Sequence, residues 1–334
     1  MKVCLYFENI NAISKSGIGR ALKHQKEALT SAGIEYTLDP DDSYDILHIN
    51  TVGITSSAVI NKAKDAGKKV IYHAHSTEED FRNSFVFSNQ LAPLVRQHLI
   101  NTYSSADYII TPTPYSRALL ESYGIPLEIS AVSNGIDLTR FEYDEEKVKA
   151  FRRYFSLQED EKVVLSVGLF FERKGILDFI EVARHFPDVK FIWFGETPLY
   201  SIPQKIREAV EEDHPDNVLF PGYVKGPIIE GAYMSADCFF FASLEETEGI
   251  VVLEALAGKR QCLLRDIPVY DPWLVHGEHC YKGKNNEEFI DLLEQILNHE
   301  VPYLGEAGYK VAQERSIASV GQQLKAIYQK VLRG

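Results

Sequence analysis

Short apolar runs alternate along this chain with longer segments in which apolar residues recur at helical spacing. The short runs predict buried strands, and the longer segments predict amphipathic helices between them. The expected strands are Lys2–Phe7, Asp45–Ile49, Val70–Tyr72, Tyr108–Thr111, Ile129–Val132, Lys162–Val167, Val189–Phe194, Val218–Phe220, Cys238–Phe241 and Gln261–Leu264. Because strands alternate with helices in both halves, we expect an α/β fold of two doubly wound parallel sheets facing a cleft.

The chain is long enough for two domains, because a single hydrophobic core rarely grows beyond about 250–300 residues and this chain has 334. We expect a first domain over residues 1–150, a second over 151–310 and a C-terminal helix within 311–334. The charged helix at Asp144–Phe155 is the expected linker region. The C-terminal helix carries an apolar stripe made of Val320, Leu324, Ile327, Tyr328 and Val331.

Composition and charge argue against several classes of protein. The net charge of −13 disfavours general nucleic-acid binding. No run reaches the ~18 apolar residues of a membrane span, and the N-terminus enters a strand rather than a signal sequence. The four cysteines are dispersed, so we expect a cytoplasmic protein with reduced thiols and no metal site.

The stretch Phe240–Gly258 carries the strongest chemical signal. A strand enters a turn with three carboxylates, among them Glu246, and an apolar helix then carries a single charge, Glu254. A carboxylate in an apolar helix is costly unless it is partnered or meets a ligand. The start of this helix can hold an anion on the amides of Gly249, Ile250 and Val251. Two carboxylates on either side of an anion-binding helix start suit a nucleotide sugar. The alternative is that Glu254 pairs with an arginine elsewhere in the chain.

Two further loops carry groups that can bind phosphate. Gly168 follows a strand of the second half, and Arg173 and Lys174 stand just before the next helix, where they can clamp a diphosphate. The alternative is a pair of surface cations at a helix start. In the first half, Gly17 and Gly19 open a helix, which is a weak signal for a phosphate cradle.

A strand of the first half ends in two histidines, His73 and His75. Ligands of open parallel sheets meet the carboxyl ends of strands, so a histidine there is placed for chemistry. Alternation puts both side chains on one face of the strand, and either could instead be a core histidine.

The segment Phe81–Ser104 has many aromatic and aliphatic residues and no acid. It surrounds an expected helix that begins near Pro93, and Arg82, Phe85, Phe87 and Arg96 are the candidates for contact with an anionic membrane surface. A core helix with an ordinary polar face is the alternative.

Three of these motifs together resemble the retaining glycosyltransferases of family 4, which have the two-domain GT-B fold. The resemblance rests on His75, on Arg173 with Lys174, and on Glu246 followed seven residues later by Glu254 and Ala-Leu-Ala-Gly. It implies that Glu254 binds the ribose of the donor and that Glu246 and His75 face the donor sugar. Arg173 and Lys174 would bind the donor phosphates without a metal or other cofactor.

Other residues take their expected roles from the same resemblance. Gly222 and Val224 match a loop whose backbone faces the nucleotide base, and the glycine loop with Gly17 and Gly19 would face the cleft. The C-terminal helix would return to pack on the first domain. The family usually has Gly-Phe-Gly after the first glutamate, whereas this chain has Thr247-Glu248-Gly249.

At finer resolution, the residues Tyr72–Phe81 and the Glu-Glu-Thr-Glu-Gly turn are similar to those of Gram-positive glycosyl-diacylglycerol synthases, including those that make lipoteichoic acid anchors. This likeness implies an enzyme that adds galactose or glucose from a UDP-hexose to α-glucosyl-diacylglycerol. It would act as a peripheral protein on the inner face of the cell membrane.

Three other functions remain open at this stage. A soluble family 4 transferase acting on a cell-wall or capsular polysaccharide shares every donor motif. The loop Gly17-Ile18-Gly19 allows a nucleotide-binding oxidoreductase. A sensor of sugar nucleotides without catalysis is the third.

Overall fold

The computed structural model describes residues 1–8 and 17–333 and divides the chain into two compact units. The first unit contains residues 1–81, 90–137 and 315–334, and the second contains 82–89 and 138–314. The sequence had suggested boundaries at 150 and 310. The difference arises because α7 (Glu145–Tyr154), the expected linker, packs on α10 (Pro227–Ser235) of the second unit.

The first unit is built on a six-stranded parallel sheet in the order β2-β1-β3-β4-β5-β6. Its strands are β1 (Lys2–Tyr6), β2 (Glu35–Thr37), β3 (Ile46–Ile49), β4 (Lys69–His73), β5 (Tyr108–Thr111) and β6 (Ile129–Ala131). Successive residues of β1 face opposite sides, so Val3 and Leu5 enter one apolar cluster and Cys4 enters the other. A strand buried on both faces is typical of a parallel sheet covered by helices on each side.

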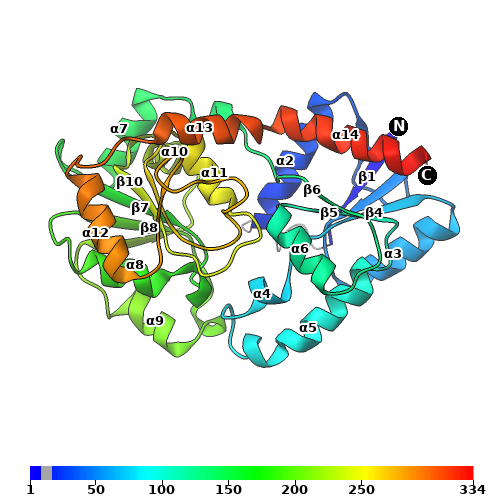
Figure 1. Cartoon of the computed structure of the whole chain (residues 1–334), viewed down its shortest axis with the longest axis horizontal. Helices are drawn as coiled ribbons and strands as arrows, with labels where there is room; N and C mark the ends of the chain where they lie inside the picture. Colours follow the sequence, from blue (N-terminus) through cyan, green and yellow to red (C-terminus); the bar gives the residue numbers. More distant parts are fainter. Residues whose placement is uncertain (9–16, 334) are drawn as a thin grey trace. The chain divides into compact units, whose positions relative to one another are not determined.

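Among the described residues, this unit contains the helices α2 (Gly17–Ser31), α3 (Ile54–Asp65), α4 (Glu78–Phe81), most of α5 (Ser88–Tyr103), α6 (Pro114–Ser122) and α14 (Ile317–Arg333), which are labelled in Figure 1. The helices α2 and α14 supply one apolar cluster, and α3, α5 and α6 supply the other. The C-terminal α14 lies directly on α2, because Gly321 has no Cβ and an added one would lie 2.3 Å from the Ala28 carbonyl oxygen.

The second unit has a six-stranded parallel sheet in the order β12-β11-β10-β7-β8-β9. Its strands are β7 (Val163–Val167), β8 (Lys190–Phe194), β9 (Val218–Gly222), β10 (Cys238–Phe241), β11 (Cys262–Arg265) and β12 (Tyr281–Gly283). Besides α7 and α10, its helices are α8 (Ile176–Ala183), α9 (Gln204–Glu211), α11 (Ile250–Ala257), α12 (Asn286–Leu297) and α13 (Gly305–Glu314). Short 3-10 turns occupy Leu138–Phe141, Glu172–Lys174 and Leu199–Ser201.

The expected fold class of two doubly wound parallel sheets is confirmed. The sequence missed β2 and β12, which are three-residue strands at the sheet edges and too short to show a pattern. It also placed the start of α5 near Pro93, whereas the helix begins at Ser88. All four cysteines are free and buried. Within the described residues, no helix combines the length and the apolar character needed to cross a membrane.

Candidate functional site

The strand order of the second sheet fixes where its ligand site lies. The chain runs outward from β7 through β8 to β9, and β10 then returns to the other side of β7. Such a reversal opens a crevice at the carboxyl ends of the two central strands, where open α/β sheets bind ligands. The loop after β7 carries Arg173 and Lys174, and the loop after β10 carries Glu246. Two motifs that are about 70 residues apart are therefore brought to one place by the topology.

A close backbone approach joins these two loops. Gly175 has φ +77°, and a Cβ built on it would lie 2.2 Å from the carbonyl oxygen of Ala242. The Leu244 amide donates to the Arg173 carbonyl oxygen at 2.6 Å. Glycine is needed at 175 both for its positive φ and for this contact.

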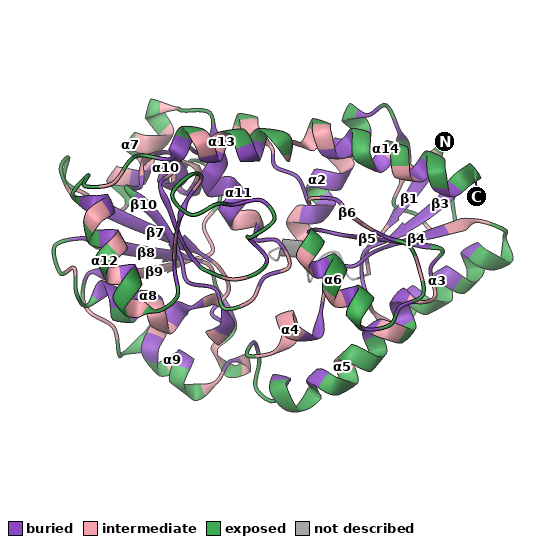
Figure 2. Cartoon of the chain, in the orientation of Figure 1, coloured by how far each residue is buried: buried purple, intermediate pink, exposed green. Residues whose placement is uncertain are grey.

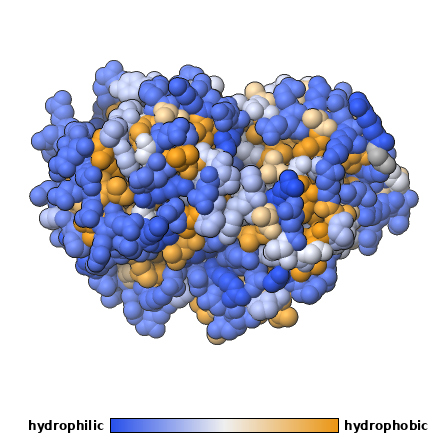
Figure 3. All heavy atoms as spheres, viewed as in Figure 1, coloured by the Kyte–Doolittle hydropathy of each residue, from blue (hydrophilic) through white to orange (hydrophobic). Residues whose placement is uncertain are grey.

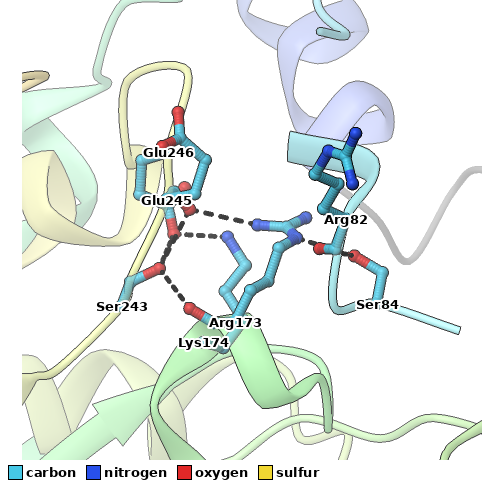
Figure 4. Close-up of polar contacts among 7 residues, drawn as sticks. All are labelled: Arg82, Ser84, Arg173, Lys174, Ser243, Glu245 and Glu246. Carbon is cyan, nitrogen blue, oxygen red and sulfur yellow. Dashed lines mark hydrogen bonds and ion pairs between the residues drawn. The ribbon is translucent and has the colours of Figure 1, made fainter. Parts of the chain in front are cut away.

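Lys174 and Glu246 form an ion pair at the centre of the site (Figure 4). Both side chains are largely buried, with 14% and 7% of their surface exposed. Ser243 adds a hydrogen bond from its hydroxyl to Oε1 of Glu246 at 2.7 Å. The charge of Glu246 is thus held by a cation and a hydroxyl, which satisfies a carboxylate at a buried position.

Arg173 is buried next to this pair and is held on two sides. Its Nη1 donates to the Glu245 carbonyl oxygen at 3.2 Å, and its Nε donates to the Ser84 hydroxyl at 2.8 Å. The Phe171 ring lies beneath the guanidinium, with its centroid 5.5 Å from Cζ. Arg173 and Lys174 stand together after β7 and are not an exposed surface pair, whereas binding of a diphosphate stays a prediction.

The helix α11 begins beside this cluster, directly after the loop that carries Glu246. Its N-cap Gly249 has φ +90°, and no described side chain caps the helix there. The backbone amides of Ile250 and Val251 can therefore bind an anion. In the same helix, Glu254 is buried and its Oε2 accepts a hydrogen bond from the Tyr233 hydroxyl at 2.8 Å.

Tyr270 is a site residue that the sequence did not reveal. Its side chain is fully buried, and a Cβ on Gly249 would lie 3.3 Å from its hydroxyl oxygen. Within the described part of the chain this hydroxyl has no hydrogen-bond partner. Burial, and after it the charge of Glu246, raises the pKa of Tyr270 well above its ordinary value. It therefore stays neutral beside the start of α11.

The other expected donor residues of this unit lie at the same sheet edge. Gly168 follows β7 directly, and its carbonyl oxygen accepts from the Trp193 indole at 2.9 Å. Gly222 ends β9 with φ +76°, and Val224 lies two residues further on. The crevice edge is thus lined by the ends of neighbouring strands, as expected for a nucleotide site.

In the first unit, His75 belongs to a column of stacked histidines. Its ring lies 4.2 Å from that of His73, which lies 5.3 Å from that of His48. The Nε2 of His75 donates to Asn50 Oδ1 at 2.9 Å, and the Gln25 amide donates to the same oxygen at 2.8 Å. His75 is 9% exposed and His73 is 1% exposed, so His75 is the more accessible of the two.

Burial controls the charge of this column. It lowers the pKa of His48 and of His75 to about 3, and the pKa of His73 lies well below its ordinary value for the same reason. The rings are therefore neutral at physiological pH. Nothing in the sequence pointed to His48, Asn50 or Gln25, because their side chains become neighbours of the histidines only when the unit folds.

The glycine loop of the first unit is described only in part. Gly17 opens α2 and Gly19 follows within its first turn, whereas Ser16 lies outside the described residues. Whether this loop meets a phosphate stays a prediction.

The residues proposed for membrane contact differ in what surrounds them. Phe85, Val86 and Phe87 are exposed by 41%, 42% and 68%, whereas the guanidinium of Arg96 lies 3.7 Å from Glu78 and 4.6 Å from the Tyr123 ring centroid. Arg82 is only half-buried. The segment thus exposes apolar side chains, and Arg96 is likewise exposed while its guanidinium is paired with Glu78.

The exposure continues into α5, whose Leu91 and Leu94 are 46% and 69% exposed. Much of this helix is coloured as exposed in Figure 2. In Figure 3, hydrophobic atoms interrupt the hydrophilic surface along the lower edge, in the region where Figure 1 draws α5. The core-helix alternative holds for part of the segment, since Leu99 and Tyr103 of the same helix are core residues. Contact of the exposed part with a membrane stays a prediction.

Two family models match the sequence. Residues 35–140 match the family described as Glycosyltransferase Family 4, and residues 147–311 match Glycosyl transferases group 1. A processive diacylglycerol alpha-glucosyltransferase of Acholeplasma laidlawii is 52% identical over 100% of this chain and 99% of its own length. An alpha-galactosylglucosyldiacylglycerol synthase of Streptococcus pneumoniae is 25% identical over 77% of this chain and 68% of its own.

Solved structures share the fold at low identity. Sucrose-phosphate synthase of Thermosynechococcus elongatus has a TM-score of 0.81 and 17% identity over 100% of this chain and 99% of that one. Anabaena HepE, in complex with UDP and glucose, has a TM-score of 0.80 and 14% identity over 99% of this chain and 100% of that one. Together with the strand order, these likenesses assign the chain to the GT-B fold.

Proposed function

Because this chain belongs to glycosyltransferase family 4, we propose that it is a retaining hexosyltransferase that moves glucose from UDP-glucose to a diacylglycerol glycolipid. The observation that carries this proposal is the 52% identity, over the whole chain, to a diacylglycerol alpha-glucosyltransferase. It favours glucose over galactose, which the sequence alone left open. The oxidoreductase alternative falls with the family assignment.

The donor is held by groups of the second unit. Arg173 and Lys174 bind the diphosphate, and the uncapped start of α11 adds the amides of Ile250 and Val251. Glu254 accepts the hydroxyls of the ribose, with Tyr233 fixing its orientation through the 2.8 Å hydrogen bond. The backbone near Gly222 and Val224 receives the base.

The same cations promote the chemical step. As the bond between the anomeric carbon and the phosphate oxygen breaks, negative charge grows on the departing diphosphate. Arg173, Lys174 and the α11 amides are already placed to stabilise it. The acceptor hydroxyl attacks from the face that the phosphate leaves, and its proton passes to the departing phosphate oxygen. This same-face path retains the configuration of the sugar.

Glu246 orients the donor sugar from the second unit. Donor binding draws Lys174 toward the phosphates, so Glu246 can exchange part of its ion pair for sugar hydroxyls. His75 presents a neutral imidazole, because burial holds its pKa at about 3, and it can therefore exchange hydrogen bonds with a hydroxyl without adding charge. A β-linked product from the α-linked donor would overturn this part of the proposal.

The acceptor is a membrane lipid, and the protein meets it as a peripheral enzyme on the cytoplasmic face. The apolar residues Phe85, Val86 and Phe87 are exposed, and no acid lies between Phe81 and Ala106. Exposed aromatic residues in a segment that itself contains no acid suit the boundary of an anionic bilayer.

A release assay tests the function directly. UDP release is measured with UDP-glucose or UDP-galactose, each with diacylglycerol, α-glucosyl-diacylglycerol or no acceptor. We expect release that requires UDP-glucose and a diacylglycerol lipid, with the product lipids identifying which acceptor is used. If only a soluble glycan supports release, the acceptor is a cell-wall or capsular polysaccharide instead. Release of UDP without transfer of the sugar to any acceptor would count against both the lipid and the polysaccharide as acceptor.

Vesicle sedimentation tests the membrane contact separately. Phe87→Asn removes the apolar ring while keeping a residue that tolerates the φ of +65° found there. We expect weaker partitioning to vesicles that contain phosphatidylglycerol. Tyr143→Asn is the matched control, because Tyr143 is 74% exposed outside this segment. Equal partitioning of both variants and the wild type would argue against contact at Phe87.

A further inference from the structure

We propose that the loop 82–89 positions Arg173 and that contact of its exposed tip with a bilayer is transmitted through Arg173 to binding of the donor diphosphate. This inference rests on the proposed function, since it assumes a lipid surface and a diphosphate donor. It adds a role for Ser84 as a positioning residue. The loop is named here the aromatic loop, and its tip is Phe85, Val86 and Phe87.

The aromatic loop holds Arg173 by both its backbone and its side chain. The Arg173 amide donates to the Asn83 carbonyl oxygen at 3.1 Å, and its Nε donates to the Ser84 hydroxyl at 2.8 Å. Ser84 is 2% exposed and Arg173 is 7% exposed, so this contact is shielded from water. Figure 4 shows Ser84 on one side of the guanidinium and the Glu245 carbonyl on the other. Moving the loop therefore moves one of the two supports of Arg173.

The loop is closed by its own side chains, so it moves as a unit. The Asn83 amide donates to Asn89 Oδ1 at 3.0 Å, and Asn89 Nδ2 returns a hydrogen bond to Asn83 Oδ1 at 2.7 Å. The Ser84 amide donates to the Ser88 hydroxyl at 3.3 Å. A displacement at the tip is thus carried to Asn83 and Ser84 at the base.

The backbone is strained at the last residue of the tip. Phe87 has φ +65°, a region that is costly for a phenylalanine, whereas Asn83 has φ +53°, which an asparagine tolerates. The Phe87 side chain is 68% exposed, so packing within the described chain does little to hold it. A strained and exposed loop can change its backbone conformation when its tip moves from water into lipid.

One aromatic residue connects the tip to Arg173. The Phe85 ring packs edge-on against Phe171 at a centroid distance of 4.7 Å, and the Arg173 guanidinium lies over the same Phe171 ring. The Val86 amide donates to the Ser201 carbonyl oxygen at 3.2 Å. Phe85 is itself 41% exposed. Insertion of its ring into a bilayer therefore changes the packing of Phe171, the ring that supports Arg173.

A bilayer is the occupant that the tip fits best. Its three residues are apolar and adjacent, and the chain has no acid until Asp107. A partner protein would more often be met by a patch that includes polar residues at its rim. A tip of three apolar residues in an acid-free segment instead suits insertion into the headgroup boundary of anionic lipids.

The test measures UDP binding by calorimetry with and without phosphatidylglycerol vesicles that contain no glycolipid acceptor. We expect vesicles to tighten UDP binding to the wild type by about fivefold, the lower end of typical coupling between sites. Ser84→Ala should bind UDP more weakly and lose most of this response while it still partitions to vesicles. Ser84→Thr, which keeps the hydroxyl, should restore the response.

Controls separate the possible failures. Ser122→Ala changes an exposed serine of α6 and should behave as the wild type. If Ser84→Ala fails to fold, Phe85→Leu keeps the tip apolar but removes the ring contact with Phe171, and it should also lose the response. An equal response of wild type, Ser84→Ala and Phe85→Leu overturns the inference, as does a wild type whose UDP affinity ignores vesicles. Loss of the proposed function would instead appear in the release assay, which needs an acceptor.

Discussion

The imidazole of His48 and the hydroxyl of Tyr328 form a 2.6 Å hydrogen bond although 280 residues separate them. If the hydroxyl donates to Nδ1 of His48, the Nε2 proton of His48 points to Nδ1 of His73 at 3.2 Å. The C-terminal helix α14 is thereby connected to the histidine column that contains His75. Burial keeps His48 neutral by lowering its pKa to about 3, so one of its two ring nitrogens accepts and the other donates.

The first prediction concerns pH. The folded-state pKa values of His48 and His75 lie at about 3, below the unfolded value near 6.5. Between these values the unfolded chain binds more protons, so stability is lost as pH falls below about 6.5. We expect each histidine to reduce the free energy of unfolding by about 2 kcal/mol between pH 6.5 and 5, measured by urea titration.

A pair of variants checks the cause of this pH dependence. His48→Asn should flatten the profile, because one buried titration is removed. His299→Asn should not, because His299 is exposed and its φ of +58° suits asparagine. Parallel profiles for the two variants would contradict the assignment to the column.

The second prediction compares two buried tyrosines. Tyr328→Phe leaves Nδ1 of His48 without its partner and should lower the free energy of unfolding by about 1–3 kcal/mol. Tyr270→Phe removes a hydroxyl that has no partner among the described residues, so stability should change little or rise. Thermal and urea unfolding of both variants measure the difference, and a larger loss for Tyr270→Phe would be inconsistent with it.

The third prediction separates the two carboxylates of the donor site. Glu246→Ala should lower kcat about 100-fold or more while changing the affinity for UDP less than Glu254→Ala does. The reason is that Glu246 is assigned to the sugar and Glu254 to the ribose, which UDP retains. Steady-state kinetics and UDP titration give both quantities, and the reverse ranking of UDP affinities would overturn the assignment.

The fourth prediction concerns the junction of the two donor loops. Gly175→Ala places a methyl group 2.2 Å from the Ala242 carbonyl oxygen, so the loops must separate and Lys174 must move relative to Glu246. We expect loss of activity and of several kcal/mol of stability. Gly124→Ala is the control, since its φ of +78° is similar but nothing lies within 4 Å of the added methyl; it should cost about 1–2 kcal/mol.

Much of the fold could be read from the sequence, because apolar periodicity reports burial directly. The strand Cys238–Phe241 was predicted to the residue, since it is apolar throughout and directly follows the charged Asp237. The edge strands β2 and β12 were not, because three residues on a sheet edge carry no periodic signal. The segment 82–89 belongs to the second unit, which its place in the sequence did not indicate.

The sequence by itself determined which chemical groups the donor site contains. A charged residue next to an apolar strand or helix is costly unless it has a partner or a ligand. This cost makes four residues recognisable in the sequence, namely Arg173, Lys174, Glu246 and Glu254. Only the tertiary structure decided which side chains hold these groups in place. Ser84 bonds to Arg173 and Ser243 bonds to Glu246. Tyr233 bonds to Glu254, and Asn50 bonds to His75. These partners are serines, an asparagine and a tyrosine, which are common in any sequence, and they acquire a role only when the fold brings distant segments together.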